Sequence, residues 1–358
     1  MACWKQDEKR PLHLGFSFVR GLREKSIRSS PQLDKGLTLL VGNFNYFALR
    51  IFQSTIHILQ LLSIRSKFST HVIIAFALLL IFESGVRSIQ NDYTEKARLF
   101  SQSCDSIETL ILGSSVAFRG INPILINENT FNYAFQGQSH DVDQSILETL
   151  HKELPRLNEV LIPVSTHSMK NHLSNSVDPQ RASHYSLFTE FNVSSSWRNQ
   201  LAFTNFVYYR DRLLEYLRKP SRFISIDNYG YSPLSAESRT TEFSNIELEI
   251  KLKNWQEKTK LPSNKGKESL LTIAEFCRKK NIKLILIETP YSPSFELAAE
   301  EVFAADAMRI ARIMSMDFPN VFFIQVPEAL FEDSDFADPT HLNSTGAKKW
   351  SNLIQENL

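Results

Sequence analysis

The chain has 358 residues, of which 42% are apolar and 22% are charged, an ordinary globular composition that excludes wholesale disorder. Residues 1–70 carry 11 Lys and Arg against 4 Asp and Glu, whereas the remaining residues carry 29 against 35. A basic head on a mildly acidic body indicates membrane topology rather than nucleic-acid binding, because the body has no basic stripe interleaved with aromatic residues.

The first region, residues 1–66, has no pattern typical of a folded domain. Residues 1–36 are polar and basic without clear periodicity, so we expect them to be poorly ordered. Residues 44–62 are apolar and aromatic but interrupted by polar side chains, which favours an interfacial amphipathic helix over a second membrane span.

An apolar run follows this basic head. Val72–Phe82 is eleven consecutive apolar residues, and with its flanks it predicts a single transmembrane helix over 67–88, with Glu83 near an interface. Arg65 and Lys67 precede the run, so the positive-inside tendency places the N-terminus in the cytoplasm and the rest of the chain outside it. A buried core helix is the alternative, although nothing upstream resembles a domain able to bury it.

The body, residues 100–358, alternates between strands and helices. Buried-strand patterns occur at 107–113, 130–137, 158–165, 282–290 and 321–327. Helical patterns occur at 139–154, 268–281, 296–316 and 343–358. This alternation predicts a three-layer α/β/α fold with a parallel five-stranded sheet, in which ligands bind beyond the carboxyl ends of the strands.

Residues 166–265 interrupt the alternation, which indicates an insertion over that edge of the sheet. One clear helical pattern lies within it, at 196–219. The insertion is rich in aromatic residues that could line a substrate groove or form a small core of their own: Trp197, Tyr208, Tyr229 and Tyr231.

Two short segments could carry acyl chemistry. The first strand runs into Gly113, Ser114 and Ser115, which places two hydroxyls at the carboxyl edge of the sheet. Near the C-terminus, Asp338 stands three residues before His341 on a Pro-containing turn. A carboxylate so placed can hold the ring Nδ1 and leave Nε2 as a base for a serine. The alternative is a capped surface turn with an incidental histidine.

The other histidines of the body lack a comparably placed acid, so we interpret them as surface or structural residues: His140, His151, His167, His172 and His184. The three cysteines are far apart and give no metal-binding spacing. Neither a Gly-x-Gly-x-x-Gly pattern nor a P-loop lysine follows the first strand, which disfavours a nucleotide-binding protein. We therefore expect neither a metal nor a cofactor.

Taken in chain order, "LGSS", "FQGQS" and "DPTH" resemble the conserved blocks of the SGNH/GDSL hydrolase family. The resemblance covers about residues 105–358, less the insertion. It is strongest to a membrane-anchored, extracytoplasmic branch, whose first block reads Gly-Ser-Ser and which is related to envelope acyl-transfer proteins. The resemblance implies a flavodoxin-like sheet.

It also implies residue roles. Ser115 matches the nucleophile, with Ser114 in the place of the family's aspartate, and Asp338 and His341 complete a Ser-His-Asp triad. The backbone N–H of Gly137, in the second block, would join that of Ser115 in an oxyanion hole.

The third block departs from the family pattern. "LIPVSTHS" has no asparagine at the matching point, so the side-chain oxyanion donor is missing or is replaced by Ser165. Loss of one such donor can lower a rate by about 100- to 1000-fold.

The resemblance implies a serine esterase or O-acyltransferase that acts on acyl esters of a cell-envelope glycan or lipid. Its partners would be an acylated glycan or other ester, the membrane and a membrane protein of envelope biosynthesis, with no nucleic acid. The alternative is a catalytically weak or inactive SGNH-fold protein that binds polysaccharide or serves in assembly. The missing asparagine favours this alternative, and retention of the three triad residues disfavours it.

Overall fold

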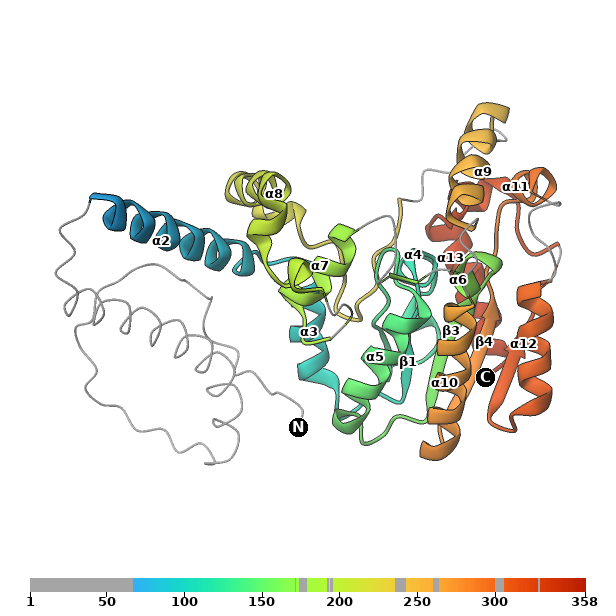
Figure 1. Cartoon of the computed structure of the whole chain (residues 1–358). Helices are drawn as coiled ribbons and strands as arrows, with labels where there is room; N and C mark the ends of the chain where they lie inside the picture. The colour runs from blue at the N-terminus through green and yellow to red at the C-terminus, as the bar shows by residue number, and fades with distance from the viewer. Residues whose placement is uncertain are drawn as a thin grey trace. The chain divides into compact units, whose positions relative to one another are not determined.

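The structure is a computed structural model. It describes residues 67–170, 172–173, 179–191, 193, 196–235, 243–259, 264–299, 306–327 and 329–358 (Figure 1). The chain divides into two units, Met1–Leu80 and Ile81–Leu358. The disorder predicted for 1–36 and the interfacial helix predicted for 44–62 lie outside the described residues.

Helix α2 covers Lys67–Arg87 and contains the predicted membrane span. Its window Thr70–Arg87 has a mean hydropathy of 1.6, with 11% of its residues buried. This helix is long and apolar enough to cross a membrane, because about 20 residues in helical conformation span the hydrocarbon layer of a bilayer.

Five parallel strands form the central sheet in the order β2-β1-β3-β4-β5. They are β1 (Thr109–Ile111), β2 (Thr130–Asn132), β3 (Glu159–Val164), β4 (Lys283–Glu288) and β5 (Val321–Ile324). Leu110, Leu161 and Leu286 are completely buried, as expected for strands that are covered on both faces. The predicted fold class is confirmed, and the strand order is that of flavodoxin-like sheets.

Helices cover both faces of this sheet (Figure 1). Helices α5 (His140–Leu150) and α10 (Lys265–Lys280) pack against each other on one face. On the other face, α4 (Ser115–Gly120) packs against α13 (Ser344–Glu356), whose Trp350 is fully buried in the main core. The other α-helices are α3 (Asp92–Ser103), α6 (Thr166–Lys170), α7 (Pro179–Phe188), α8 (Phe206–Arg218), α9 (Asn245–Thr259), α11 (Pro293–Ala298) and α12 (Asp306–Asp317).

Short 3₁₀ turns and one small hairpin complete the described elements. The turns are η1 (Pro123–Leu125), η2 (His151–Glu153), η4 (Trp197–Gln200), η5 (Ala202–Asn205), η6 (Pro220–Arg222) and η7 (Asp333–Asp335). The hairpin is antiparallel and consists of β6 (Phe336–Asp338) and β7 (His341–Leu342). It carries the predicted Asp338 and His341.

Two predicted helices are shorter than expected. The pattern over 196–219 forms the turns η4 and η5 before α8 begins at Phe206. The break occurs at Leu201, which is extended, and at Ala202, whose backbone N–H donates to the Glu83 carboxylate at 2.8 Å instead of to a helical carbonyl. The pattern over 296–316 is divided between α11 and α12, and residues 300–305 lie outside the described part.

The last turns of α2 belong to the second unit. Val86 and Ile89 are buried in a second apolar cluster together with Ala202, Tyr209 and Phe223. The position of Glu83 near a membrane interface remains a prediction. Glu83 is 7% exposed, accepts a hydrogen bond from Ala202 N and pairs with Arg87 at 2.9 Å. Its charge is therefore compensated within the protein.

Candidate active site

The turn between β1 and α4 positions Ser115. Gly113 has a φ of +113°, and a Cβ at this position would lie 3.1 Å from the ring of Pro163, so the turn requires glycine. The chain then passes through Ser114, which is extended, and α4 begins at Ser115. Because α4 follows β1 directly, Ser115 lies at the carboxyl edge of the sheet.

Ser115, His341 and Asp338 come together there, as predicted. Ser115 Oγ lies 2.8 Å from His341 Nε2, and His341 Nδ1 lies 2.7 Å from Asp338 Oδ2. Since Nδ1 donates to the carboxylate, Nε2 presents its lone pair to the hydroxyl. The β6–β7 hairpin fixes the spacing, because Asp338 and His341 are paired across it.

The second oxygen of Asp338 has three donors. Oδ1 accepts from the backbone N–H of Thr340 at 2.9 Å, from its hydroxyl at 3.0 Å, and from Lys251 Nζ at 2.9 Å. Burial alone would raise the pKa of Asp338, but the hydrogen bond from His341 and the positive charges of His341 and Lys251 hold this pKa far below its ordinary value. The carboxylate therefore stays ionised beside the imidazole.

Asp143 connects the two turns of the site and was missed in the sequence. This carboxylate is fully buried and accepts hydrogen bonds from Gly113 N at 2.8 Å, Gln138 Nε2 at 2.6 Å and His140 Nδ1 at 2.9 Å. Gly113 precedes the serines, and Gln138 follows Gly137. One buried anion thus holds the first and second sequence blocks together.

The prediction that the other histidines lack a comparable acid was wrong for two of them. His140 pairs with Asp143, and His172 lies 3.7 Å from Asp141. Both acids come from the first turn of α5, and Asp143 follows its histidine instead of preceding it. The position that a base requires, within hydrogen-bonding distance of Ser115 Oγ, is filled by His341.

Gly137 lies in the second turn of the site. It has a φ of +67°, a backbone conformation that strains any residue other than glycine, and the Arg181 guanidinium lies where a Cβ would stand. This turn is connected to the first turn through Phe135 N, which donates to Gly113 O at 3.3 Å. The oxyanion role of Gly137 remains a prediction.

Ser165 follows β3 and is nearly buried. Its Oγ accepts from Ser168 N at 3.1 Å and is hydrogen-bonded to the hydroxyl of Tyr291. Burial raises the pKa of Tyr291, so this phenol stays protonated and can donate. The role of Ser165 as a substitute oxyanion donor also remains a prediction.

Within the part of the chain that the structure describes, no group of three or more His, Cys, Asp or Glu side chains could hold a metal ion.

The chain has little similarity to known proteins. A family model whose description carries no family name matches residues 241–358, the segment with Lys251, Asp338 and His341. No curated protein matches the chain. One similar solved structure is a Streptococcus pneumonia protein described, provisionally, as a platelet activating factor. It is 11% identical, with a TM-score of 0.36, over 81% of this chain and 98% of that one.

A carbohydrate acetylesterase family member from Sinorhizobium meliloti is also similar, at 10% identity and a TM-score of 0.29, over 70% of this chain and 97% of that one. Similarity at this level carries no argument about function. The function is therefore argued from the geometry of the site.

Proposed function

We propose that the chain is a serine esterase or O-acyltransferase of the SGNH type that works through an acyl-Ser115 intermediate. The relay from Ser115 Oγ to His341 Nε2 at 2.8 Å, and from His341 Nδ1 to Asp338 at 2.7 Å, is the observation that carries this proposal. A serine hydroxyl is a weak nucleophile by itself, and such a relay supplies the base and the group that orients the base.

In the first step, His341 takes the proton of Ser115 Oγ while Oγ forms a bond to the ester carbonyl carbon. The tetrahedral intermediate collapses as the ester C–O bond breaks, and His341 returns the proton to the departing alkoxide oxygen. In the second step, water or an acceptor hydroxyl gives its proton to His341 and attacks the acyl-serine. The bond between the acyl carbon and Ser115 Oγ then breaks, and His341 returns the proton to Oγ. Asp338 remains ionised throughout and stabilises the imidazolium.

The developing oxyanion needs donors that are already in place. We assign them to the backbone N–H groups of Ser115 and Gly137, supplemented by the hydroxyl of Ser165. Ser165 thus takes the place of the family's asparagine, and the rate depends on how well its hydroxyl substitutes for an amide.

The proposed substrate is an acyl ester of a cell-envelope glycan or lipid. Support comes from α2, which can span a membrane, and from the basic residues before it. In this arrangement α2 is a single span, the N-terminus lies in the cytoplasm, and the catalytic domain lies outside it. A membrane protein of envelope biosynthesis would then be the partner that delivers the acyl group.

A second candidate is a catalytically weak SGNH-fold protein that binds polysaccharide or serves in assembly. The observation that favours it is the third block, "LIPVSTHS", where Ser165 stands at the family's asparagine position. The candidates differ in one property, since only the enzyme needs a reactive Ser115.

The test is turnover of 4-nitrophenyl acetate by the full chain and by Ser115→Ala. We expect the variant to lose at least about 10³-fold in kcat, as is usual when a triad serine is removed. Ser114→Ala is the matched control and should retain most of the activity. A fluorophosphonate probe should label the wild type and not Ser115→Ala. Equal turnover by wild type and Ser115→Ala would overturn the proposal, and absence of both turnover and labelling in the wild type would favour the second candidate.

A further inference from the structure

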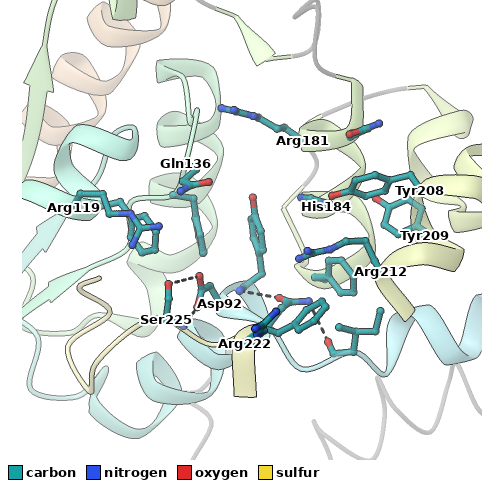
Figure 2. Close-up of a pocket in the computed structure, with 18 residues that line it drawn as sticks. Asp92, Arg119, Gln136, Arg181, His184, Tyr208, Tyr209, Arg212, Arg222 and Ser225 are labelled. Atoms are coloured by element: carbon teal, nitrogen blue, oxygen red, sulfur yellow. Dashed lines mark hydrogen bonds between the residues drawn. The ribbon is translucent and has the colours of Figure 1, made fainter. Parts of the chain in front are cut away.

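A cavity of about 400 Å³ lies within the second unit, and it is lined by Phe118, Arg119 and Gln136, which are close in sequence to Ser115 or Gly137. Figure 2 shows Arg119 and Gln136 on one side of it, His184, Tyr208, Tyr209 and Arg212 on the other, and Asp92, Ser225 and Arg222 below. Four arginines line this cavity, Arg119, Arg181, Arg212 and Arg222. Asp92 is the one carboxylate among the described residues that line it.

That carboxylate is already engaged. Asp92 accepts from Ser225 N at 2.6 Å and from Ser225 Oγ at 2.9 Å. Each of its oxygens has a donor, and one carboxylate cannot balance the charge of four arginines. The lining therefore carries a surplus of positive charge, which an anionic ligand would neutralise.

Arg119 is fixed in the wall. It donates to the carbonyl oxygen of Ser232 at 3.2 Å and to the hydroxyl of the same residue, and its guanidinium lies over the Phe118 ring, 4.7 Å from the centroid. Burial lowers the pKa of Arg119, which indicates that the protein compensates this charge only in part. Phe118 also forms part of the cavity wall.

The opposite wall is equally cationic. Arg212 lies over the Phe223 ring at 4.3 Å and pairs with Glu215 at 3.2 Å. Arg222 forms no side-chain hydrogen bond or ion pair with any residue that the structure describes. The hydroxyl of Tyr93 likewise has no hydrogen-bond partner among the described residues, and burial raises its pKa, so it remains a protonated donor facing the cavity.

We propose that this cavity binds a small anionic ligand, a phosphate ester or a carboxylate carried on a body of about sugar size. Guanidinium groups match both oxyanions through paired N–H donors. The volume lies within the range of about 300–1,000 Å³ that is typical of small-molecule sites. Aromatic side chains provide apolar wall for the ring of the ligand: Tyr93, Phe118, Phe135, Phe188, Tyr208 and Phe223.

The position of the cavity connects it with the reaction, and this step rests on the proposed function. Arg119 lies one helical turn after Ser115 on α4, so the two side chains share a face of that helix. Gln136 lines the cavity next to Gly137, and Arg181 lines it while contacting Gly137. An anionic group held there would place the ester of the same molecule near Ser115, so the cavity would select acyl donors or acceptors that carry a negative charge.

Binding can be measured without catalysis, by calorimetry on the full chain in neutral detergent at low salt. The probes are inorganic phosphate, glucose 6-phosphate, glucuronate and neutral glucose. We expect the anionic sugars to bind and glucose not to bind. The double variant Arg212→Gln/Arg222→Gln should weaken that binding at least tenfold. Arg210→Gln, on the same helix but outside the cavity lining, should leave the affinity unchanged. The anionic sugar with the higher affinity, glucose 6-phosphate or glucuronate, identifies the class of oxyanion that the cavity prefers. Binding of inorganic phosphate but of neither sugar indicates a site for the anionic group without its sugar.

Equal binding by wild type and the double variant, or binding of glucose as tightly as of the anionic sugars, would overturn the proposal. Ser115→Ala should bind the anionic probes like the wild type. A wild-type chain that binds these probes but has no esterase activity contradicts only the proposed function. Conversely, an active esterase that binds none of the anionic probes contradicts only the cavity proposal.

Discussion

Asp143 is a positioning residue whose importance follows from its donors. It holds Gly113 and Gln138, which flank the turns of Ser115 and Gly137, and it lies in the interior within hydrogen-bonding distance of His140 Nδ1. The three donors stabilise this buried carboxylate. Replacing it would leave donors unpaired in the interior, and each unpaired donor lowers the free energy of unfolding by about 1–3 kcal/mol.

We predict that Asp143→Asn lowers kcat by about 10- to 100-fold with little change in KM, since the two turns would shift while the substrate contacts persist. The amide replaces one acceptor oxygen with a donor that faces other donors. Steady-state kinetics on a soluble acetyl ester measure the two parameters. Glu148→Gln, exposed on the same helix, is the control, and an Asp143→Asn enzyme with wild-type kcat would contradict the positioning role.

Asp338 gives a prediction of pH dependence. Its pKa in the folded protein is depressed, so it contributes stability above the unfolded-state value of about 3.9, and this contribution is lost as the pH falls through the folded value. The difference in unfolding free energy between wild type and Asp338→Asn should therefore be constant near neutral pH and shrink below about pH 4. The side chain is 41% exposed, so the difference should be small. Urea unfolding at pH 6 and pH 3 measures it, and a difference that grows on acidification would contradict the prediction.

Ser115, Asp338 and His341 could be predicted because they occur in short motifs at the ends of predicted elements. In a parallel sheet such ends meet at one edge. Lys251 could not, since it approaches Asp338 from 87 positions away on an insertion helix, and a lone lysine on a helix has no distinguishing pattern. Asp143 was within reach of the sequence. It follows His140 by three residues, the reverse of the order of Asp338 and His341.

Helix α10 packs closely on the segment that follows Ser165. A Cβ at Gly266, in the first turn of α10, would lie 2.4 Å from the carbonyl oxygen of Ser168 and 2.6 Å from that of Met169. Carbonyl groups of a neighbouring helix cannot turn away as a flexible side chain can. The absence of a side chain at Gly266 thus sets how near α10 lies to α6.

We predict that Gly266→Ala destabilises the fold by about 1–3 kcal/mol despite the higher helix propensity of alanine, because overpacking outweighs that gain. It should also lower esterase activity through displacement of Ser165. Thr272→Ala, at an exposed position of α10, is the control and should change stability little. Urea unfolding compares the variants, and a stabilised Gly266→Ala would show that α10 and α6 separate without cost.

The elements with continuous apolar sequence, such as β3 and β4, were predictable because burial on both faces leaves no polar position in the run. The break before α8 was not, since it depends on Glu83, which approaches Ala202 from 119 positions away. The hairpin β6–β7 was not predicted as strands either, because a strand of two or three residues is too short to show alternation.

The compact unit Ile81–Leu358 begins inside a helix that is itself long enough to cross a membrane. Phe82 packs on Phe206 of the insertion with ring centroids 4.8 Å apart, and Val86 is fully buried. The last turns of α2 thus provide part of the core of the second unit.

We therefore predict that a fragment of residues 81–358 is more stable than one of residues 91–358. The shorter fragment lacks Val86 and Ile89, and burial of each contributes about 1.5–3 kcal/mol. It also lacks Glu83, so the N–H of Ala202 loses its acceptor. Thermal unfolding should show a lower midpoint for 91–358, and limited proteolysis should cut it first near α8, since that helix packs on the missing turns. If both fragments melt together and resist protease equally, the end of α2 is only an anchor and contributes nothing to the fold.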